Sequence, residues 1–485
     1  MNKRMIARIL GKVLLIFAAL MLLPLAAGLW YGERVTNFII AIAATAAAGG
    51  LLRAIPVHSH TIFTRDGFAA VGLAWIFMGL FGALPFVLSG DIPNYIDAVF
   101  ETVSGLTTTG ASVVPNVEAM SRAGLFWRLF THWIGGMGVL VFIMAVMPAG
   151  DEHSMHIMRA EVPGPTVGKL VPKARETARI LYFIYGGLTV AETVLLKLGG
   201  MSFYDALLHA FATAGTGGFS TRAASIAAFN SVYIEMVIAV FLVLFGANFN
   251  LYYLVFIGRA REALKSEELR WYFAIIALST LSIAAGIAKM YGGADALRHA
   301  FFNTMSIVST AGFGTVDFTA WPQYAQYILV LLMFIGGCAG STGGGMKLSR
   351  VMLLLKTAAA DIVSMLHPRE VRRVQMDGKR VDAATTKAVY CFFFIYLFII
   401  LVTGLIVSLD GYDFATNFTA ALSCMSNIGP GLSLIGPMGS FAIFSPAVKI
   451  VLTVVMLLGR LEIYPIVMLA SPKLLIKKYK GKFVV

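Results

Sequence analysis

The sequence predicts an all-helical integral membrane protein in which four similar units surround one central pore. Of its 485 residues, 58% are hydrophobic and only 13% are charged, whereas soluble domains carry about 25% charged residues. Apolar runs of about 20 residues recur along the chain, and this is the length that a helix needs to cross a bilayer. Between pairs of these runs, a short glycine-bearing stretch occurs four times.

The four stretches share one pattern, in which a small polar residue stands two positions before a glycine. Four positions earlier again stands another small residue, at Ser104, Ala212, Ser306 and Ser423. Glycine suits a backbone that leaves the helical region and offers its carbonyls to a ligand. Four carbonyl-bearing loops around one axis make a cation selectivity filter. The predicted filter residues are Thr108, Thr109, Gly110, Thr216, Gly217, Gly218, Thr310, Ala311, Gly312, Asn427, Ile428 and Gly429.

An alternative is that these stretches are ordinary turns between helices. Independent turns need not share their spacing, whereas these four recur in register with a span on either side. Irregular backbone at membrane depth is tolerated only where it is buried in protein or lines a water-filled path. We therefore favour the filter interpretation.

The order of these features divides the chain into an accessory hairpin and four repeats. Residues 9–31 and 35–55 predict the two helices of the hairpin, which lacks the glycine stretch. Each repeat reads as span, short helix, glycine loop and span, which gives about ten spans in all. The short helices have candidate N-caps at Asp97, Asp205, Asp295 and Asp413. The predicted units are the hairpin at 1–60 and the repeats at 61–150, 151–260, 261–366 and 367–485. The two spans of each repeat, in order, are 67–89 with 125–148, 178–198 with 231–257, 271–290 with 324–355, and 388–408 with 447–470.

Lysine and arginine concentrate in the loops that alternate with the glycine loops. This asymmetry predicts that both termini and the basic loops face the cytoplasm, and that the glycine loops face outward. It also argues against nucleic-acid binding, although the formal net charge is +13, because basic loops are normal in a membrane protein. Each short helix would direct the negative end of its dipole toward the membrane centre, which favours a cation.

The residue types in the glycine loops favour a monovalent cation as substrate. The loops contain no ring of carboxylates, which a divalent-selective pore would more plausibly carry. Glu101 comes closest, but it lies on the short helix, nine residues before Gly110. The three cysteines, Cys338, Cys391 and Cys424, show neither metal-ligand spacing nor a disulfide framework. We expect no cofactor within this chain.

A run of glycines interrupts the second span of the third repeat. Each glycine costs roughly 1 kcal/mol relative to alanine in a helix, so the run should unwind the span at mid-membrane, just below the filter. We interpret it as an intramembrane gate. Alternatives are a close-packing face of small residues and a phosphate-binding loop, although Met346 stands where that motif needs lysine. The predicted gate comprises Gly336, Gly337, Gly340, Ser341, Thr342, Gly343, Gly344, Gly345 and Arg460.

Arg460 lies deep in the last predicted span, where a charge is expensive and calls for a partner. Glu462 is only two residues further on, which is poor spacing for a helical pair. We expect Arg460 to hydrogen-bond carbonyls of the 336–345 loop and to add a positive barrier beneath the filter. The alternative is an ion pair with an acidic residue elsewhere in the bundle.

Other polar residues give weaker signals. Helix packing is favoured over a proton relay for three histidines, His132, His209 and His299. A cytoplasmic loop is favoured over a metal site for Asp151, Glu152, His153 and His156, because no second pair of ligands is visible. Anionic lipid headgroups or an acidic partner would suit Arg369, Arg372 and Arg373.

Three motifs give the chain a family resemblance: Gly-Gly-Phe-Ser-Thr at 217–221, the glycine run after Ile335, and Gly-Arg-Leu-Glu at 459–462. The whole chain resembles the Trk/Ktr/HKT superfamily of potassium transporters, most closely its bacterial TrkH branch. The resemblance implies that Gly110, Gly218, Gly312 and Gly429 form the filter, and that four glycines select potassium. It also implies the gate loop, an arginine at the constriction, a homodimer in the bacterial inner membrane, and a cytoplasmic TrkA-like regulatory subunit that binds NAD or ATP.

The function that we expect is potassium uptake through a channel-like, gated pore. An ion-coupled secondary transporter, driven by protons or sodium, is the alternative within transport. Such carriers usually show inverted or twofold repeats, whereas these repeats run in one direction. A membrane enzyme would need a convergent nucleophile with an acid and base, or a metal cluster, and the predicted spans contain no such set.

Overall fold

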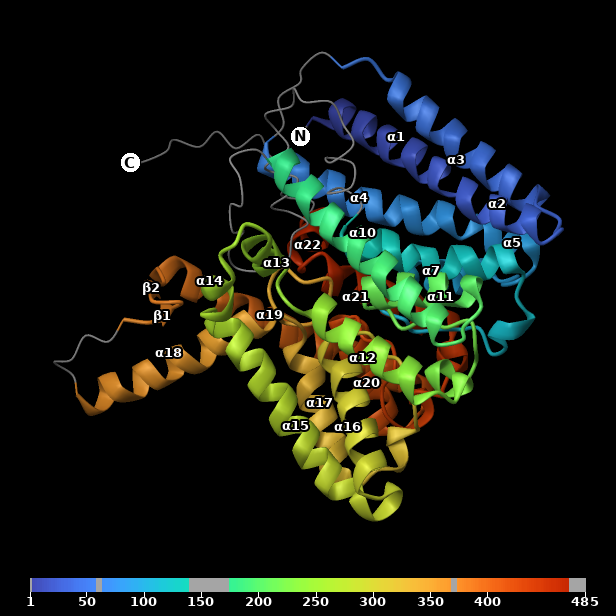
Figure 1. Cartoon of the computed structure of the whole chain (residues 1–485). Coiled ribbons are helices and arrows are strands. Elements are labelled where there is room, and N and C mark those ends of the chain that lie inside the picture. The colour runs from blue at the N-terminus through green and yellow to red at the C-terminus, as the bar shows by residue number, and fades with distance from the viewer. Residues whose placement is uncertain (1, 58–62, 139–173, 368–372, 471–485) are drawn as a thin grey trace, which may run out of the picture.

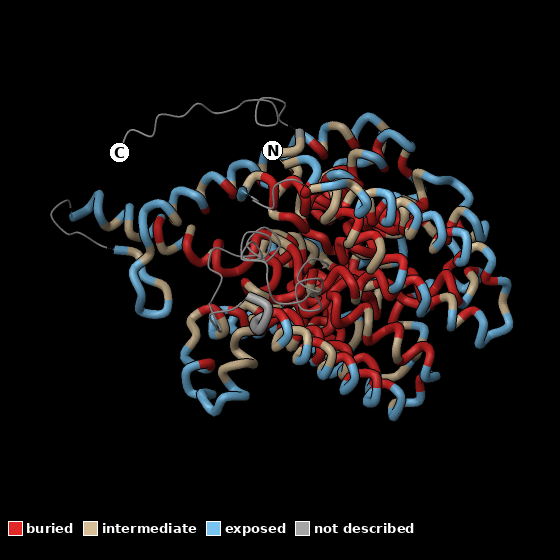
Figure 2. The backbone as a smooth tube through the Cα atoms, turned by 90° about the horizontal axis from the view of Figure 1, so that it is seen from above, coloured by how far each residue is buried: buried red, intermediate tan, exposed pale blue. Residues whose placement is uncertain are grey.

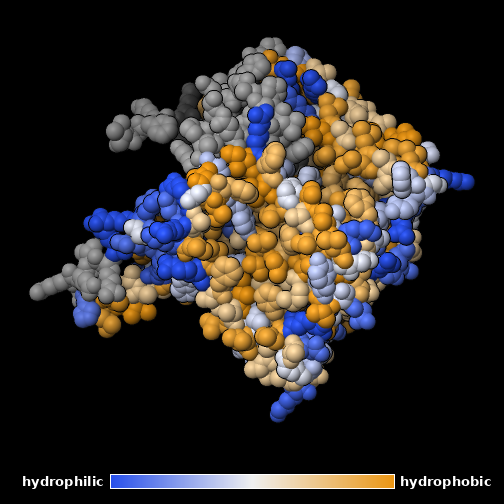
Figure 3. Space-filling model, in the orientation of Figure 1, coloured by the Kyte–Doolittle hydropathy of each residue, from blue (hydrophilic) through white to orange (hydrophobic). Residues whose placement is uncertain are grey.

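The computed structural model describes residues 2–57, 63–138, 174–367 and 373–470. Helices dominate these residues and confirm the predicted all-helical class (Figure 1). Buried residues gather in the centre of the bundle, and exposed residues lie along its outside (Figure 2). Apolar side chains also cover much of the outer surface (Figure 3), which suits a protein surrounded by lipid.

The N-terminal hairpin consists of α1 (Lys3–Leu20), continued by α2 (Leu22–Trp30), and α3 (Thr36–Ala54). The Asn2 side chain caps α1 by accepting the Met5 amide. The two arms approach closely where two glycines meet, because a Cβ on Gly11 would lie 2.6 Å from the Gly49 carbonyl oxygen. Small residues that let helix backbones approach in this way are typical of packing within membranes.

Each repeat opens with an apolar helix. Six of the described helices are long and apolar enough to cross a membrane, and the bent pair α12–α13 would make a seventh. The first helix of every repeat is among the six, together with both arms of the hairpin. These first helices are α4 (Thr64–Gly82) with α5 (Leu84–Ser89), α10 (Ala174–Leu198), α15 (Glu267–Tyr291) and α19 (Ala383–Val407).

A shorter helix follows in each repeat and ends inside the molecule. These four pore helices are buried over most of their length, and they are α6 (Tyr95–Leu106), α11 (Phe203–Gly215), α16 (Gly293–Val308) and α20 (Phe414–Ser426). Asp413 caps α20 as predicted, by accepting the Thr416 amide. The other three predicted caps are wrong. Asn94 and Ser202 cap α6 and α11, and Gly292 precedes α16, which places Asp97, Asp205 and Asp295 in the first helical turn.

The second helix of each repeat is shorter than predicted. The first, α7 (Arg122–Gly136), ends at a glycine pair, and the rest of the predicted span 125–148 reaches residues outside the described part. The other three are each broken into two helices: α12 (Val232–Gly246) and α13 (Phe249–Phe256), α17 (Gln323–Ile335) and α18 (Leu348–Leu366), and α21 (Pro446–Arg460) and α22 (Tyr464–Ala470).

Each break coincides with a distinct feature of the local backbone. The Asn248 side chain caps α13 and starts a new helix after Gly246, with a bend of 90°. Residues 336–347 form no helix, as their glycine content predicts. Glu462 and Ile463 have φ of 53° and 69°, a left-handed conformation that no α-helix accommodates. The predictions of continuous helices over 231–257 and 447–470 are therefore wrong.

Short elements connect these helices. A helix α14 (Ala260–Leu264) follows α13, and a two-stranded antiparallel hairpin beyond α18 pairs β1 (Gln375–Met376) with β2 (Lys379–Arg380). Both α18 and this hairpin extend away from the bundle (Figure 1). The described residues also contain six 3₁₀ turns, at Val117–Ala119, Ser225–Phe229, Phe318–Ala320, Ser408–Asp410, Ser433–Ile435 and Phe441–Ile443.

Candidate functional site

The four glycine loops have the same unusual backbone. In each, the residue two positions before the glycine adopts a left-handed conformation, with φ of 55° at Thr108, 53° at Thr216, 62° at Thr310 and 56° at Asn427. The glycine itself also has positive φ, between 76° and 99°, while the residue between them does not. Left-handed conformations cost a non-glycine residue roughly 1–2 kcal/mol and concentrate at functional sites.

A shared hydrogen bond fixes how each loop leaves its pore helix. The residue before the glycine donates its amide to the carbonyl of the small residue that sequence analysis aligned, five positions earlier. These bonds join Thr109 to Ser104 at 2.8 Å, Gly217 to Ala212 at 2.9 Å, Ala311 to Ser306 at 2.8 Å, and Ile428 to Ser423 at 3.0 Å.

The four loops meet in a closed ring. A Cβ on Gly110 would lie 1.9 Å from the carbonyl oxygen of Gly217, and a Cβ on Gly218 would lie 1.9 Å from that of Ala311. A Cβ on Gly312 would lie 2.0 Å from the carbonyl oxygen of Ile428, and a Cβ on Gly429 would lie 2.7 Å from that of Thr109. Each glycine therefore faces a carbonyl of the next repeat, in the order one, two, three, four, one. At all four positions a side chain is excluded both by the nearby carbonyl oxygen and by the positive φ.

A cavity of about 150 Å³ opens above this ring. All four glycines line it, together with residues from the segments that follow Gly110, Gly218 and Gly429. Two of its lining residues are charged, Arg128 and Arg222. The ring thus lies at the floor of a vestibule that opens on one side of the molecule.

A buried ion pair holds the first two loops together. The Glu101 carboxylate accepts hydrogen bonds from the Ser112 hydroxyl and the Val113 amide, both at 2.9 Å, and from Arg128 Nε at 2.6 Å. Arg128 donates to the Ser220 carbonyl at 3.2 Å and lies over the Phe219 ring. Glu101 and Arg128 are 1% and 3% exposed. This pair, which we term the Glu101–Arg128 brace, connects the segments that follow Gly110 and Gly218.

Other side chains brace the remaining loops. The His209 ring lies 2.9 Å from the Ser220 hydroxyl, and Asn303 Nδ2 donates to Thr315 Oγ1 at 3.3 Å. In the fourth repeat the Leu432 amide donates to Thr419 Oγ1 at 2.9 Å. In every repeat, therefore, a pore-helix side chain contacts the segment just after the ring glycine.

The predicted histidines take part in these braces. His132 lies between two loops, because its Nε2 accepts the Phe219 amide and its Nδ1 lies 2.8 Å from the Gly105 carbonyl oxygen. This arrangement requires the proton on Nδ1. His299 contacts Thr315 Oγ1 at 3.2 Å. The structure thus gives the histidines polar partners beyond the packing role that the sequence favours.

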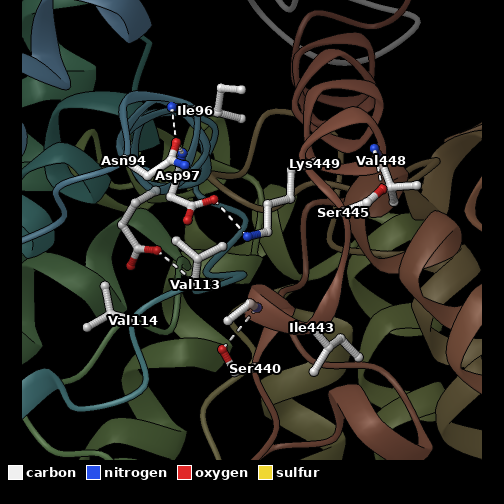
Figure 4. Close-up of polar contacts among 12 residues, drawn as sticks. Asn94, Ile96, Asp97, Val113, Val114, Ser440, Ile443, Ser445, Val448 and Lys449 are labelled. Atoms are coloured by element: carbon white, nitrogen blue, oxygen red, sulfur yellow. Dashed lines mark hydrogen bonds and ion pairs between the residues drawn. The ribbon is translucent and has the colours of Figure 1, made fainter. Parts of the chain in front are cut away.

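A second ion pair joins the first and fourth repeats. Lys449 Nζ on α21 lies 2.7 Å from Asp97 Oδ1 on α6, and Figure 4 shows the two side chains pointing toward each other. Asp97 therefore serves this contact, while Asn94 caps its helix.

The 336–347 segment lies against the glycine loops of the third and fourth repeats. The Gly344 amide donates to Thr310 Oγ1 at 2.6 Å. A Cβ on Gly343 would lie 2.8 Å from the Ser309 carbonyl oxygen, and one on Gly344 would lie 2.3 Å from that of Ser426. The segment also reaches the second repeat, since the Cys338 amide donates to the Gly246 carbonyl at 3.0 Å.

Arg460 contacts the same segment through backbone carbonyls. Its Nη1 donates to the Thr342 carbonyl at 2.7 Å. Its Nη2 donates to the Gly135 carbonyl at 2.6 Å and the Gly136 carbonyl at 2.7 Å. The two glycines end α7, where a cation suits the negative end of the helix dipole. Arg460 therefore connects three repeats at one point, and the hydrogen bond expected to the 336–345 loop is present.

Sequence reasoning missed three residues that hold this segment. Lys347, 1% exposed and with φ of 74°, donates to the Gly343 carbonyl. Glu268 on α15 accepts the Ala339 amide at 2.7 Å. Arg350 Nη1 donates to the Met346 carbonyl at 3.1 Å, and its Nη2 lies 2.7 Å from Glu462. The signal that could have found them is a charged residue within an apolar run.

The other candidate sites are the cluster at 151–156, the basic residues after α18 and the cysteines. The cluster at 151–156 and the residues Arg369 and Arg372 lie outside the described residues. All three cysteines are free. Within the described ranges, no group of three or more His, Cys, Asp or Glu residues could hold a metal ion.

These observations define a multi-pass membrane protein with a fourfold ring of pore loops, and comparison with known proteins places it in a family. Residues 34–479 match the TrkH family, described as cation transport protein, and the chain belongs to this family. It is 36% identical to the Trk system potassium uptake protein TrkH of Halomonas elongata, across 97% of this chain and 99% of that one. It is 33% identical to the Escherichia coli protein TrkG, across 96% and 98%.

A solved structure shows the same fold. The crystal structure of the potassium transporter TrkH from Vibrio parahaemolyticus matches with a TM-score of 0.88 and 35% sequence identity. The match covers 98% of this chain and 100% of that chain. The family is one of transport proteins rather than enzymes, in agreement with the expectation from sequence.

Proposed function

We propose that the chain takes up potassium through a gated pore along the axis of the glycine ring. The observation that carries the proposal is the closed ring itself, in which the carbonyls of Thr109, Gly217, Ala311 and Ile428 each lie against a glycine of the preceding repeat. Rings of backbone carbonyls replace the hydration shell of a potassium ion. The similarity to proteins named as potassium uptake proteins and as a potassium transporter supports the same conclusion.

The twelve predicted filter residues form the potassium site in this proposal. The four pore helices direct the negative ends of their dipoles at the ring and so favour a cation. The residues Gly336, Gly337, Gly340, Ser341, Thr342, Gly343, Gly344, Gly345 and Arg460 form the gate. Its contacts with Thr310 and with the helix end at Gly135 support a position on the path just inside the filter.

The wider assembly is also part of the proposal. The five units bounded at residues 60, 150, 260 and 366 carry the hairpin and the four repeats. The basic loops and both termini face the cytoplasm of a bacterium, across its inner membrane, as the distribution of lysine and arginine supports. A second copy of the chain and a TrkA-like subunit that binds NAD or ATP would complete the system, with no nucleotide bound by this chain itself.

The ion selectivity of the purified chain tests the proposal. In liposomes, we expect rubidium, a potassium substitute, to enter in strong preference to sodium and without any coupled ion. Gly110→Ser should lower the rubidium to sodium ratio by about tenfold, a loss of ~1.4 kcal/mol, because its Cβ meets the Gly217 carbonyl.

A matched control separates this contact from backbone strain. Gly90 has the same φ of 80° as Gly110, but nothing lies within 4 Å of a Cβ built there. Gly90→Ser should therefore leave the ratio unchanged. Equal effects of the two substitutions, or rubidium entry that requires protons or sodium, would count against the proposed pore, and the second result would favour an ion-coupled transporter.

A further inference from the structure

A groove opens on the lipid-facing side of the molecule, between the second and third repeats. Its volume is about 480 Å³, within the roughly 300–1,000 Å³ of small-molecule sites. Helices α12, α15 and α16 form it, and apolar residues dominate this face of the molecule (Figure 3). The residues that line it are Val232, Met236, Thr280, Ala294, Asp295, Leu297, Arg298 and Phe301.

The walls of the groove suit an acyl chain. Val232 and Leu297 are 53% and 46% exposed, so their side chains present apolar surface to whatever fills the groove. Met236 and Phe301 continue this surface. In a bilayer the surrounding apolar molecules are lipid tails, so the groove is in contact with lipid throughout.

The rim carries charges of both signs. Arg298 Nη2 lies 3.2 Å from Asp295 Oδ1, and its Nε lies 3.5 Å from Glu235 Oε2. Both distances exceed the roughly 2.7–2.9 Å of strong charge-assisted hydrogen bonds, so the guanidinium keeps donor capacity for a further acceptor. The Asp295 side chain is 60% exposed and is free to accept hydrogen bonds from outside the protein.

A hydroxyl inside the groove lacks a partner. Thr280 on α15 is 6% exposed and lines the groove. Its Oγ1 forms no hydrogen bond with the described residues, although a threonine in a helix commonly bonds to the carbonyl one turn earlier. A buried hydroxyl without a partner is unfavourable by about 1–3 kcal/mol in general, so this donor points to an acceptor supplied by a ligand.

We propose that this groove binds one phosphatidylethanolamine molecule. Its phosphate would meet Arg298, its primary ammonium would meet Asp295, and one acyl chain would lie along Met236 and Phe301, which are further along α12 and α16 than the charged rim. Thr280 would donate to an acceptor on the glycerol ester. The headgroup of phosphatidylglycerol carries no positive charge to pair with Asp295 and Glu235. The quaternary ammonium of phosphatidylcholine has no hydrogen to donate to them. The rim therefore selects a zwitterion with a primary amine.

Competitive lipid binding to the full chain tests this assignment. The purified protein in detergent is offered equal amounts of phosphatidylethanolamine, phosphatidylglycerol and phosphatidylcholine, and the lipids that it retains are counted by native mass spectrometry. We expect one phosphatidylethanolamine to be retained about three- to fivefold in preference to the others, the factor typical of one charged contact.

Three substitutions divide the site into its parts. Asp295→Asn should remove the preference for phosphatidylethanolamine over phosphatidylglycerol while lipid is still retained. Thr280→Val keeps the side-chain shape and should weaken retention of all three lipids. Ala294→Phe should close the groove and abolish retention.

A matched surface variant controls for general charge effects. Glu262 pairs with Arg259 at the same i,i+3 spacing as Asp295 and Arg298, but does not line the groove. Glu262→Gln should leave lipid retention unchanged. Equal retention of the three lipids by the unsubstituted chain would overturn the proposal. So would an Ala294→Phe variant that changes the oligomeric state with lipid retention intact, because a second copy of the chain would then be the occupant.

Discussion

Single residues behind the glycine ring determine how the loops are held. The Glu101 carboxylate accepts three hydrogen bonds and is paired with Arg128 in a buried position. A buried ion pair adds little net stability, but removal of one partner is costly because the other charge is left unpaired. The Glu101–Arg128 brace therefore acts on the geometry of the loops that follow Gly110 and Gly218 rather than as a source of net stability.

Glu101→Gln should impair selectivity more than Asp97→Asn. The first substitution leaves Arg128 unpaired at 3% exposure, and breaking such a pair costs about 3–5 kcal/mol. The second removes the carboxylate that contacts Lys449 (Figure 4). This carboxylate is 26% exposed, so solvent compensates part of the loss. The rubidium to sodium flux ratio in liposomes and the melting temperature check this order. A larger effect of Asp97→Asn would contradict the role assigned to the brace.

At the scale of elements, the second helices of three repeats are each broken into two. The Gly246 carbonyl at the α12–α13 break accepts the Cys338 amide, and the Thr342 carbonyl between α17 and α18 accepts a hydrogen bond from Arg460 at the end of α21. Irregular backbone of this kind is tolerated at membrane depth because protein buries it and partners satisfy it.

Arg460→Ala should release the 336–347 segment and increase the resting flux of rubidium. The substitution removes donors to the carbonyls of Thr342, Gly135 and Gly136, and hydrogen bonds to charged groups are worth about 1.5–3 kcal/mol each. Arg122→Ala is a suitable control, because Arg122 stacks on Tyr31 and Tyr204 at the other end of α7. The hypothesis fails if the two variants show the same flux as the unsubstituted chain.

The sequence predicts the repeats, the glycine loops and the glycine-rich segment because each has a local signature. Gly110 and its three counterparts stand out by spacing, and the 336–345 run stands out by composition. The breaks near Asn248 and Glu462 were missed because the flanking residues are apolar and read as one helix. Tertiary contacts decide those breaks: Gly246 receives a hydrogen bond from Cys338, and Glu462 pairs with Arg350. Partners distant in sequence leave no local pattern.

At the scale of the whole molecule, contacts between neighbouring repeats close the ring. Arg128 contacts the Ser220 carbonyl of the second repeat, and the Gly314 amide of the third donates to Ser225 Oγ. Asn427 of the fourth repeat donates to Thr109 Oγ1 of the first at 3.0 Å. Four consecutive segments of one chain thus contribute one glycine each to a single closed ring.

The position of a bound ion tests this account most directly. Crystals of the protein grown with thallium, an electron-dense substitute for potassium, would reveal its site by anomalous scattering. The account predicts a peak on the ring axis, coordinated by the carbonyl oxygens of Thr109, Gly217, Ala311 and Ile428, and its displacement by potassium but not by an equal concentration of sodium. Thallium bound away from the axis with the ring empty, or displaced equally by both ions, would contradict it.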